Sequence, residues 1–361
     1  MSQLKTRSAE RWRSDAGHSA LVTVGRRGAR KGPRLDWRKK LLFALVPATV
    51  LFAGAEIGCR LAFGWNESWV DCHRFHPVLG WCLREGWNGT WYWTGGHSRI
   101  NAEGIRHDEP LGPKAPREKR LLVLGDSVTF GAAVPTDQAY PAQLQKAIAA
   151  AKPDWRILNG GVTGYDPAQE AEWLEFFGCN LDPDALAIGF CRNDTCPSMR
   201  LNGLWRVDSK WAAGNWLLEH SIVIYKLHRA FWRWRAHVAR QSGELLPGQP
   251  PPDHPFGGWA FLEQNYRKID RIAKAHHWPV VLFVFPTRAI LENPPPADPL
   301  TADLHALALE LGWTVIDLAA AFEPAPAELF LPDDDIHPNA EGYRRSALKI
   351  AKDLTARKWL W

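Results

Sequence analysis

Five short apolar segments alternate with helix-compatible stretches over the last two-thirds of this chain. The apolar segments are residues 120–125, 155–161, 185–190, 279–285 and 313–318, and the helix-compatible stretches are 138–151, 263–276, 302–311 and 339–355. Short apolar runs separated by helices are typical of parallel sheets, because the crossover helices must cover both faces. The sequence therefore predicts an α/β fold, with a doubly wound, five-stranded, mostly parallel sheet and helices on both faces.

The positive charge of the chain is confined to its N-terminal tail. The 361 residues contain 44 Lys+Arg and 39 Asp+Glu, a net charge of +5. Residues 1–40 alone hold 12 basic and 3 acidic residues, so the rest of the chain is slightly acidic. A basic surface for nucleic acid is therefore not expected in the folded part. Charged residues make up only 23% of the chain, which also excludes wholesale disorder.

An apolar segment follows the basic tail. Residues 41–55 carry no charge, and the apolar character resumes to residue 63 after Glu56 and Arg60. A helix over 41–63 is long enough to cross a hydrocarbon core of about 30 Å. Glu56 and Arg60, four residues apart, can pair and reach toward the far headgroups. Basic residues at 38–40 then predict a single-pass membrane protein whose tail, 1–40, is cytoplasmic and whose later residues are extracytoplasmic, in the periplasm or at the cell surface.

Two other interpretations of this segment were weighed. The small residues at 53–55 resemble a signal-peptidase site, but a forty-residue leader before the apolar core is unusual, so an uncleaved anchor is favoured. Lipid attachment at Cys59 is disfavoured because Glu56 stands where an aliphatic residue is needed. Both the anchor and the cleaved signal export the remaining chain to an oxidising compartment. There we expect a disulfide between Cys72 and Cys82.

Two regions fall outside the predicted sheet. Residues 64–117 are rich in Trp, Gly and His and are expected to form a lead-in of turns and short strands. Residues 197–257 form an insertion that contains a basic amphipathic helix. Its apolar positions are Ile224, Leu227, Phe231, Trp234 and Val238, and its basic positions are Lys226, Arg229, Arg233, His237 and Arg240. This helix could lie on a membrane or bind an anionic polymer; we favour a lid whose aromatic face packs on the domain.

Polar residues and glycines follow the predicted strands. Ser127 comes directly after the first strand, Gly164 follows the second and Asn193 the third, while Asp334 and His337 precede the last helix. Each has an ordinary explanation, such as a helix-capping serine, a turn residue or a Ca²⁺ ligand in the acidic run 333–335. The carboxyl ends of parallel strands meet at one edge of a sheet, however, and chemistry collects there. Asp334 and His337, three residues apart, also suit a carboxylate that orients an imidazole.

These blocks resemble the SGNH, or GDSL-type, hydrolase family over residues 118–357. The resemblance implies that Ser127 is the nucleophile, His337 the general base and Asp334 the residue that orients it. It further implies an oxyanion hole formed by the Ser127 N–H, the Gly164 N–H and the Asn193 side chain. The basic tail, the membrane helix and the lead-in motifs at 76–81 and 100–106 also look like those of membrane-anchored bacterial members of the family.

One departure from the family pattern is Cys191, which stands where the third block has glycine. Asn193 is retained, but the side chain at position 191 puts in doubt how closely the backbone there can approach its neighbours. No metal site is expected, because the histidine pairs 73/76 and 276/277 lack further ligands at supporting spacing. No cofactor is expected, because glycine-rich nucleotide-binding patterns are absent.

The sequence thus predicts a serine esterase that removes an O-acyl group, acetyl first, from an extracytoplasmic glycan or a lipid-linked substrate. The alternatives are an O-acetyltransferase of a cell-surface polysaccharide that uses the same triad, and a membrane-tethered glycan-binding protein without catalytic activity. The expected organisation is a tail over 1–40, an anchor over 41–63, the lead-in over 64–117 and a hydrolase domain over 118–357.

Overall fold

The computed structural model describes residues 36–63, 72–91, 94–195, 258–296, 298–332 and 334–359, with separate positions between 217 and 238. Two compact units divide the chain, one ending at Leu51 and the other running from Phe52. The first unit contains the beginning of a long helix, α1 (Trp37–Phe63). The second unit contains the rest of this helix and every strand of the described chain.

The lead-in forms strands β1 (His73–His76), β2 (Gly80–Leu83), β3 (Asn88–Trp91) and β4 (Gly96–Arg99). The main sheet consists of β5 (Lys119–Gly125), β6 (Trp155–Asn159), β7 (Ala185–Phe190), β8 (Val280–Val284) and β9 (Thr314–Asp317). The helices around it are α2 (Ser127–Phe130), α3 (Tyr140–Ile148), α4 (Pro167–Phe176), α7 (Gly258–Ala275), α8 (Arg288–Glu292), α9 (Pro299–Leu311) and α10 (Ala340–Ala356). Single 3-10 turns are η2 (Thr136–Gln138), η3 (Gly178–Leu181), η4 (Arg192–Thr195), η7 (Ala319–Phe322) and η8 (Pro326–Leu329).

The five strands of the main sheet are all parallel, in the order β6-β5-β7-β8-β9. The predicted α/β fold is therefore confirmed. The chain begins in β5, moves outward to β6 and then returns past β5 to β7, so the winding direction reverses between β5 and β7. Crevices at such reversal points, beyond the carboxyl ends of the strands, are the usual binding sites of these sheets. We call the edge where β5 to β9 end the carboxyl edge.

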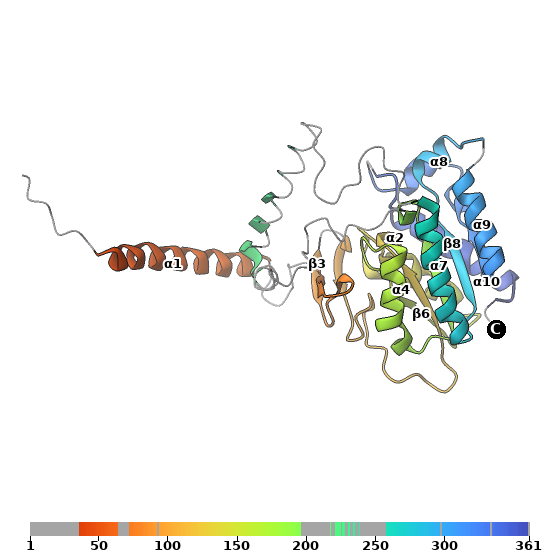
Figure 1. Ribbon diagram of the computed structural model, residues 1–361, viewed down its shortest axis with the longest axis horizontal. Coiled ribbons are helices and arrows are strands. Elements are labelled where there is room, and N and C mark those ends of the chain that lie inside the picture. The colour runs from red at the N-terminus through yellow and green to blue at the C-terminus, as the bar shows by residue number, and fades with distance from the viewer. Residues whose placement is uncertain are drawn as a thin grey trace, which may run out of the picture. The chain divides into compact units, whose positions relative to one another are not determined.

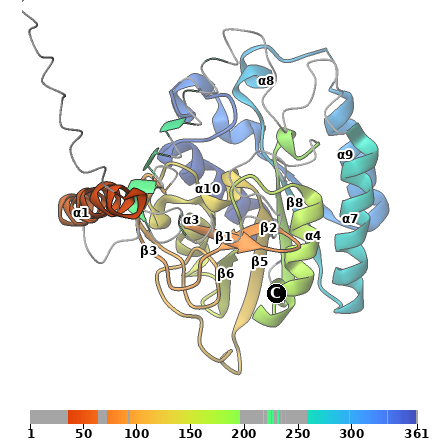
Figure 2. The same cartoon turned by 60° about the vertical axis from the view of Figure 1, so that its left-hand side comes forward.

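Alternating residues of the strands fill two separate cores. In β5, Leu122 and Leu124 belong to the core that includes residues of α4, α7 and α9. Leu121 and Val123 belong to the core on the other face, which is formed with α3 and α10. Figures 1 and 2 show α4, α7 and α9 together on one side of the sheet. Strands buried on both faces read as continuous apolar runs, which explains why the sequence revealed β5 to β8. Strand β9 is less buried, and Ile316 is its one buried residue.

Helix α4 was not predicted from the sequence. It lacks a clear apolar stripe because both its apolar and its polar side chains are buried, among them Trp173, Gln169 and Glu170. A local signal for its start was present, since Asp166 and Gln169 form a capping box around Pro167.

The lead-in forms two antiparallel hairpins, β1–β2 and β3–β4. The expected disulfide between Cys72 and Cys82 is wrong, because the structure does not join these two buried residues by a disulfide. Register explains this result: Arg74 lies opposite Cys82, and the Arg84 N–H donates to the Cys72 carbonyl at 2.8 Å. Cys72 is therefore displaced along the hairpin from the position that faces Cys82.

Arg106 ties the second hairpin to the main domain. Its guanidinium is 1% exposed and donates to the carbonyls of Phe130, Gly131 and Val134 at 2.8, 2.6 and 2.6 Å. It also donates to the Ser98 hydroxyl of β4 at 2.8 Å and lies 4.5 Å from the Phe130 ring centroid. Burial lowers the pKa of Arg106 to about 10, so the side chain is still charged at neutral pH.

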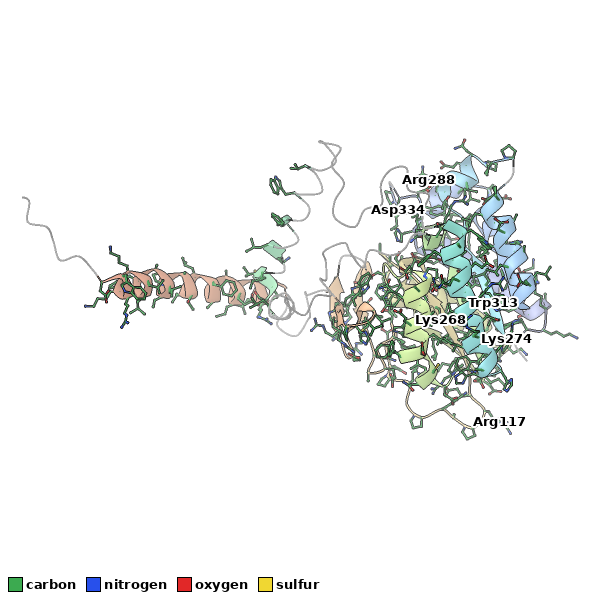
Figure 3. The ribbon with its side chains drawn as sticks, in the orientation of Figure 1. Arg117, Lys268, Lys274, Arg288, Trp313 and Asp334 are labelled. Carbon is green, nitrogen blue, oxygen red and sulfur yellow. The ribbon has the colours of Figure 1, made fainter. Side chains whose placement is uncertain are left out.

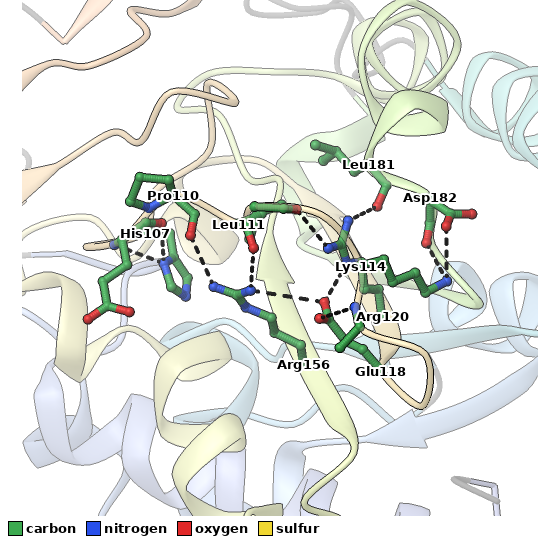
Figure 4. Close-up of polar contacts among 12 residues, drawn as sticks. His107, Pro110, Leu111, Lys114, Glu118, Arg120, Arg156, Leu181 and Asp182 are labelled. Carbon is green, nitrogen blue, oxygen red and sulfur yellow. Dashed lines mark hydrogen bonds and ion pairs between the residues drawn. The ribbon is translucent and has the colours of Figure 1, made fainter.

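The amino-terminal ends of β5 and β6 are fastened by a separate set of contacts (Figure 4). Arg120 donates to the Glu118 carboxylate at 2.6 Å and to the Leu181 carbonyl at 2.8 Å, and Arg156 donates to the Leu111 carbonyl at 2.8 Å. These contacts join the end of the lead-in to the edge of the sheet opposite the carboxyl edge. They hold the fold and lie away from the predicted chemistry.

Helix α1 contains the predicted apolar segment. Its residues 37–62 are long and apolar enough to cross a membrane, with a mean hydropathy of 1.9 in an 18-residue window that has no buried residues. Arg60 donates to Glu56 at 2.9 Å, as the spacing predicted. Glu56 also accepts hydrogen bonds from the Ser221 hydroxyl and the backbone N–H groups of Ile222 and Val223, so it caps the start of the helical positions in the insertion.

The favoured lid interpretation of the insertion is wrong for its described residues. Leu227, Phe231 and Trp234 lie at helical positions but are 65%, 52% and 58% exposed. An aromatic face packed on the domain would be buried. Apart from positions 217, 221–224, 226, 230 and 238, the other residues of 197–257 lie outside the described part of the chain, as does Cys196.

Arg106→Met should destabilise the protein by about 3 to 5 kcal/mol, because it removes all the hydrogen bonds that the buried guanidinium donates to the carbonyls of Phe130, Gly131 and Val134 and to the Ser98 hydroxyl. Urea unfolding of the detergent-solubilised chain measures the loss. Arg99→Met, at an exposed position of β4, is the matched control and should change stability by no more than about 0.5 kcal/mol. Equal losses in the two variants would contradict the role of Arg106.

Candidate active site

Ser127 lies at the turn between β5 and α2, on the carboxyl edge. Gly125 ends the strand, and Asp126 caps the helix by accepting the Val128 N–H at 2.8 Å. Ser127 is the first helical residue, and its hydroxyl oxygen lies 2.8 Å from Nε2 of His337. The two residues are 210 positions apart in the sequence. Both are partly exposed, so solvent and ligands can reach the hydroxyl.

His337 is oriented by Asp334. The Nδ1 atom of His337 lies 2.8 Å from Oδ2 of Asp334, and Oδ1 accepts the backbone N–H groups of Ile336 and His337 at 2.8 and 2.9 Å. The carboxylate therefore holds both the ring and the backbone of the same turn. A hydrogen bond from Nδ1–H to the carboxylate leaves Nε2 as the acceptor that faces the Ser127 hydroxyl.

The aspartates of the acidic run 333–335 have different contacts. Asp335 turns away from the imidazole and accepts the Ala289 N–H at 2.6 Å, near the start of α8. Figure 3 shows Asp334 and Arg288, the first residue of α8, at the same end of the domain. Asp333 lies outside the described residues. Among the described carboxylates of the run, it is Asp334 that contacts His337.

The pKa of Asp334 reflects these contacts. Burial alone raises the pKa of this carboxyl, but hydrogen bonds from the His337 side chain and from the His337 and Ile336 backbones outweigh burial and lower the pKa to about 2. Asp334 is therefore a carboxylate throughout the neutral range. Its negative charge therefore lies directly beside the imidazole of His337.

Gly164 lies in a tight turn at the carboxyl edge. We call residues 162–165 the oxyanion turn, after the role that the resemblance predicts for Gly164. The Tyr165 N–H donates to the Val162 carbonyl at 3.1 Å, and Gly164 has a φ of +77°, a value that favours glycine. The chain just before the turn lies against α2, because a Cβ on Gly161 would overlap the backbone of Thr129 and Phe130. The turn is thus held next to the helix that begins with Ser127.

Asn193 follows β7 in the single turn η4. Its Nδ2 donates to Oδ2 of Asp126 at 2.8 Å, and the same oxygen lies 3.2 Å from the Ser127 hydroxyl oxygen. Asp126 therefore links the amide of Asn193 to the turn between β5 and α2 that contains Ser127. An amide nitrogen carries two hydrogens, so one stays available for a second acceptor. The contacts bring Ser127, Asn193, Asp334 and His337 into one group.

The sequence reasoning missed three buried acids beneath this group: Asp126, Glu170 and Asp194. Burial, together with the charge of Asp126, raises the pKa of Glu170 and of Asp194 well above the usual range. Neither carboxyl oxygen of Glu170 has a hydrogen-bond partner within the described chain. The only local hint was the capping position of Asp126, and nothing in the sequence indicated that the acids meet.

The departure at Cys191 does not disturb the position of Asn193. The Cys191 N–H donates to Oδ2 of Asp194 at 2.8 Å, and the side chain is fully buried in the core shared with α3 and α10. Burial and the nearby acids Asp126 and Asp194 raise the pKa of its thiol well above the usual range. A neutral, buried thiol packs as a small apolar group.

The fold and these contacts define a class of protein. A serine at a strand-to-helix turn, bonded to a histidine that is bonded to an aspartate, is the constellation of serine hydrolases on α/β sheets. The family model described as "GDSL-like Lipase/Acylhydrolase family" matches residues 123–345. The chain belongs to this family, as the resemblance predicted, and is an ester hydrolase.

Comparison with solved structures gives neighbours of low identity. TesA has 18% identity and a TM-score of 0.43, over 66% of this chain and 99% of TesA. Axe2, an acetylxylan esterase from Geobacillus stearothermophilus, has 17% identity and a TM-score of 0.43, over 65% and 94% of the two chains. A lipase/acylhydrolase from Enterococcus faecalis has 16% identity and a TM-score of 0.40, over 66% and 96%. No curated protein matches the chain.

Glu170→Gln should make the protein more stable than the wild type, by a margin that grows with pH. The unfolded chain releases the Glu170 proton above about pH 4.3, whereas the folded protein retains it, so wild-type stability falls as pH rises from that value. The neutral amide does not titrate. Urea unfolding at pH 4.5, 6 and 7.5 measures the difference. A margin that stays constant with pH would contradict the raised pKa of Glu170.

Proposed function

We propose that this chain hydrolyses an O-acyl ester through an acyl-enzyme on Ser127. The observation that supports this is the continuous hydrogen-bond chain from Ser127 through His337 to Asp334, with both links at 2.8 Å. A serine hydroxyl is a weak nucleophile until a base removes its proton. In the first step, Nε2 of His337 takes this proton while Oγ bonds to the ester carbonyl carbon. Asp334 stabilises the imidazolium that results.

The second part of the proposal concerns the oxyanion. The carbonyl oxygen becomes negative when Oγ adds, and it needs donors that are already in place. We assign these donors to the N–H groups of Ser127 and Gly164 and to the free hydrogen of the Asn193 amide. Collapse of the intermediate releases the alcohol, which takes the proton from His337. Water then repeats the sequence on the acyl-enzyme and releases the acid.

The substrate we propose is an O-acyl group, acetyl first, on an extracytoplasmic glycan or a lipid-linked substrate. A cavity of about 230 Å³ lies at the carboxyl edge beside the site, and Arg192, next to Asn193, lines it, whereas the five predicted site residues do not. Its polar wall is formed by Arg192, Asp298 and Thr301, where Arg192 donates to Asp298 at 2.9 and 3.0 Å. Such a wall suits a hydroxyl-bearing leaving group.

We further propose that α1 anchors the protein in a membrane. Residues 38–40 are basic and directly precede the apolar part of the helix. The positive-inside rule then assigns the N-terminus to the cytoplasm and the hydrolase domain to the outside. Labelling of the domain in intact spheroplasts by an impermeant reagent tests this orientation.

Ser127→Ala should reduce hydrolysis to background, because no other nucleophile is placed at the turn. Asn193→Ala should lower kcat by about 10² to 10³, the usual cost of one oxyanion donor. The assay uses short acyl esters and acetylated glycans with the full-length protein in detergent. Wild-type rates in the Ser127→Ala variant would overturn the proposal. Failure of a fluorophosphonate to label Ser127 would instead favour a binding protein, and transfer of acetyl to an added glycan would favour an acetyltransferase.

The acidic run provides a matched pair of variants. Asp334→Asn should lower kcat far more than Asp335→Asn, because only the first removes the carboxylate from the imidazole. An amide at 334 can also stabilise the wrong imidazole tautomer, which in a triad costs up to about 10⁴ in kcat. Asp333→Asn serves as a second control. Comparable losses in the Asp334→Asn and Asp335→Asn variants would show that the contact between Asp334 and His337 does not matter to the reaction.

A further inference from the structure

The β1–β2 hairpin, which precedes the hydrolase domain in sequence, contacts the oxyanion turn directly. The indole Nε1–H of Trp81, in β2, donates to the Thr163 carbonyl at 3.1 Å. Thr163 and Gly164 are the two central residues of the turn that closes from Val162 to Tyr165. The Gly164 φ of +77° is the value that a type II turn has at its third position.

The peptide unit between Thr163 and Gly164 explains why this contact matters. A trans peptide is planar, so its C=O and its N–H point in opposite directions. The Thr163 carbonyl and the Gly164 N–H belong to the same peptide unit. A donor that holds the carbonyl on one side therefore aims the N–H at the other side. Rotation of this peptide by half a turn converts a type II turn into a type I turn and reverses the N–H.

Other contacts make the hairpin a rigid support for this carbonyl. The Tyr165 hydroxyl donates to the Trp81 carbonyl at 2.6 Å, and the Thr163 hydroxyl lies 2.8 Å from Nε2 of His73. Trp81 is 8% exposed and His73 is 3% exposed. A Cβ on Gly164 would lie 3.3 Å from the Trp81 ring, so the indole also packs against the turn. A reversed peptide would leave the buried indole N–H without its acceptor, which is costly.

We propose that Trp81 is a positioning residue of the oxyanion hole: its indole N–H holds the Thr163 carbonyl and thereby aims the Gly164 N–H at the developing oxyanion. The inference rests on the proposed function, because it assigns a role to Gly164 in ester hydrolysis. Trp81 itself touches neither the nucleophile nor the reacting carbonyl. Trp81 acts only by increasing the fraction of molecules in which the Gly164 N–H points at the oxyanion.

The test is Trp81→Phe in the full-length protein, which removes the N–H donor and keeps an aromatic ring. We expect kcat for acyl ester hydrolysis to fall about 10-fold or more, with about 10³ as the limit set by complete loss of one oxyanion donor. KM should change less than about twofold, because the contact acts on the transition state. Trp313→Phe is the matched control, since its indole N–H is also buried and donates to Asp270 at 3.0 Å. Figure 3 shows Trp313 well separated from Asp334.

Two analogues introduced at position 81 keep the test decisive if the Phe variant does not fold. Benzothienylalanine retains the shape of tryptophan without the N–H and should lose activity, whereas 7-azatryptophan retains the N–H and should keep kcat within about twofold of wild type. Wild-type kcat in the benzothienylalanine protein, or equal losses in Trp81→Phe and Trp313→Phe, would overturn the role of Trp81. An inactive wild type, or an active Ser127→Ala variant, would instead overturn the proposed function.

Discussion

A fully buried guanidinium, that of Arg106, imposes the arrangement on which the rest of the hydrolase domain depends. A charge removed from water must be surrounded by acceptors, and Arg106 finds them on Ser98 of β4 and on the carbonyls that follow the start of α2. Arg106 therefore joins the lead-in to the segment that contains Ser127. The hairpins that precede the family-matched region, residues 123–345, are part of the architecture of the site.

The topology of the sheet brings the chemical groups together. The winding direction reverses between β5 and β7, and Ser127 and Asn193 leave the carboxyl ends of these two strands. The segment before α10 supplies His337 and Asp334 at the same edge. Asp126 then joins the two strand ends through its contacts with Ser127 and Asn193. A single carboxylate thus contacts the residues that follow both strands.

Burial disfavours the charged forms of the acids beneath the site. Asp126, Glu170 and Asp194 lie close enough to affect one another, and their common burial raises the pKa of Glu170 and Asp194. Asp334 is the opposite case, because donors from its own turn lower its pKa to about 2 despite its burial. Two differences account for this: Glu170 is fully buried, whereas Asp334 is partly exposed, and Asp334 accepts three hydrogen bonds, whereas Glu170 has none within the described chain. The negative charge is therefore placed beside the imidazole.

The sequence by itself determined the five apolar strands of the main sheet, the apolar helix with its Glu56–Arg60 pair, and the spacing of Asp334 and His337. Each of these depends on burial or on neighbours within one turn of a helix, and such constraints leave a local pattern. Only the tertiary structure decided that Trp81 bonds to Thr163, that Asn193 bonds to Asp126, that no disulfide joins Cys72 and Cys82, and that Leu227, Phe231 and Trp234 of the insertion are exposed. These outcomes depend on strand register and on residues tens of positions apart, and no local periodicity records which distant groups become neighbours.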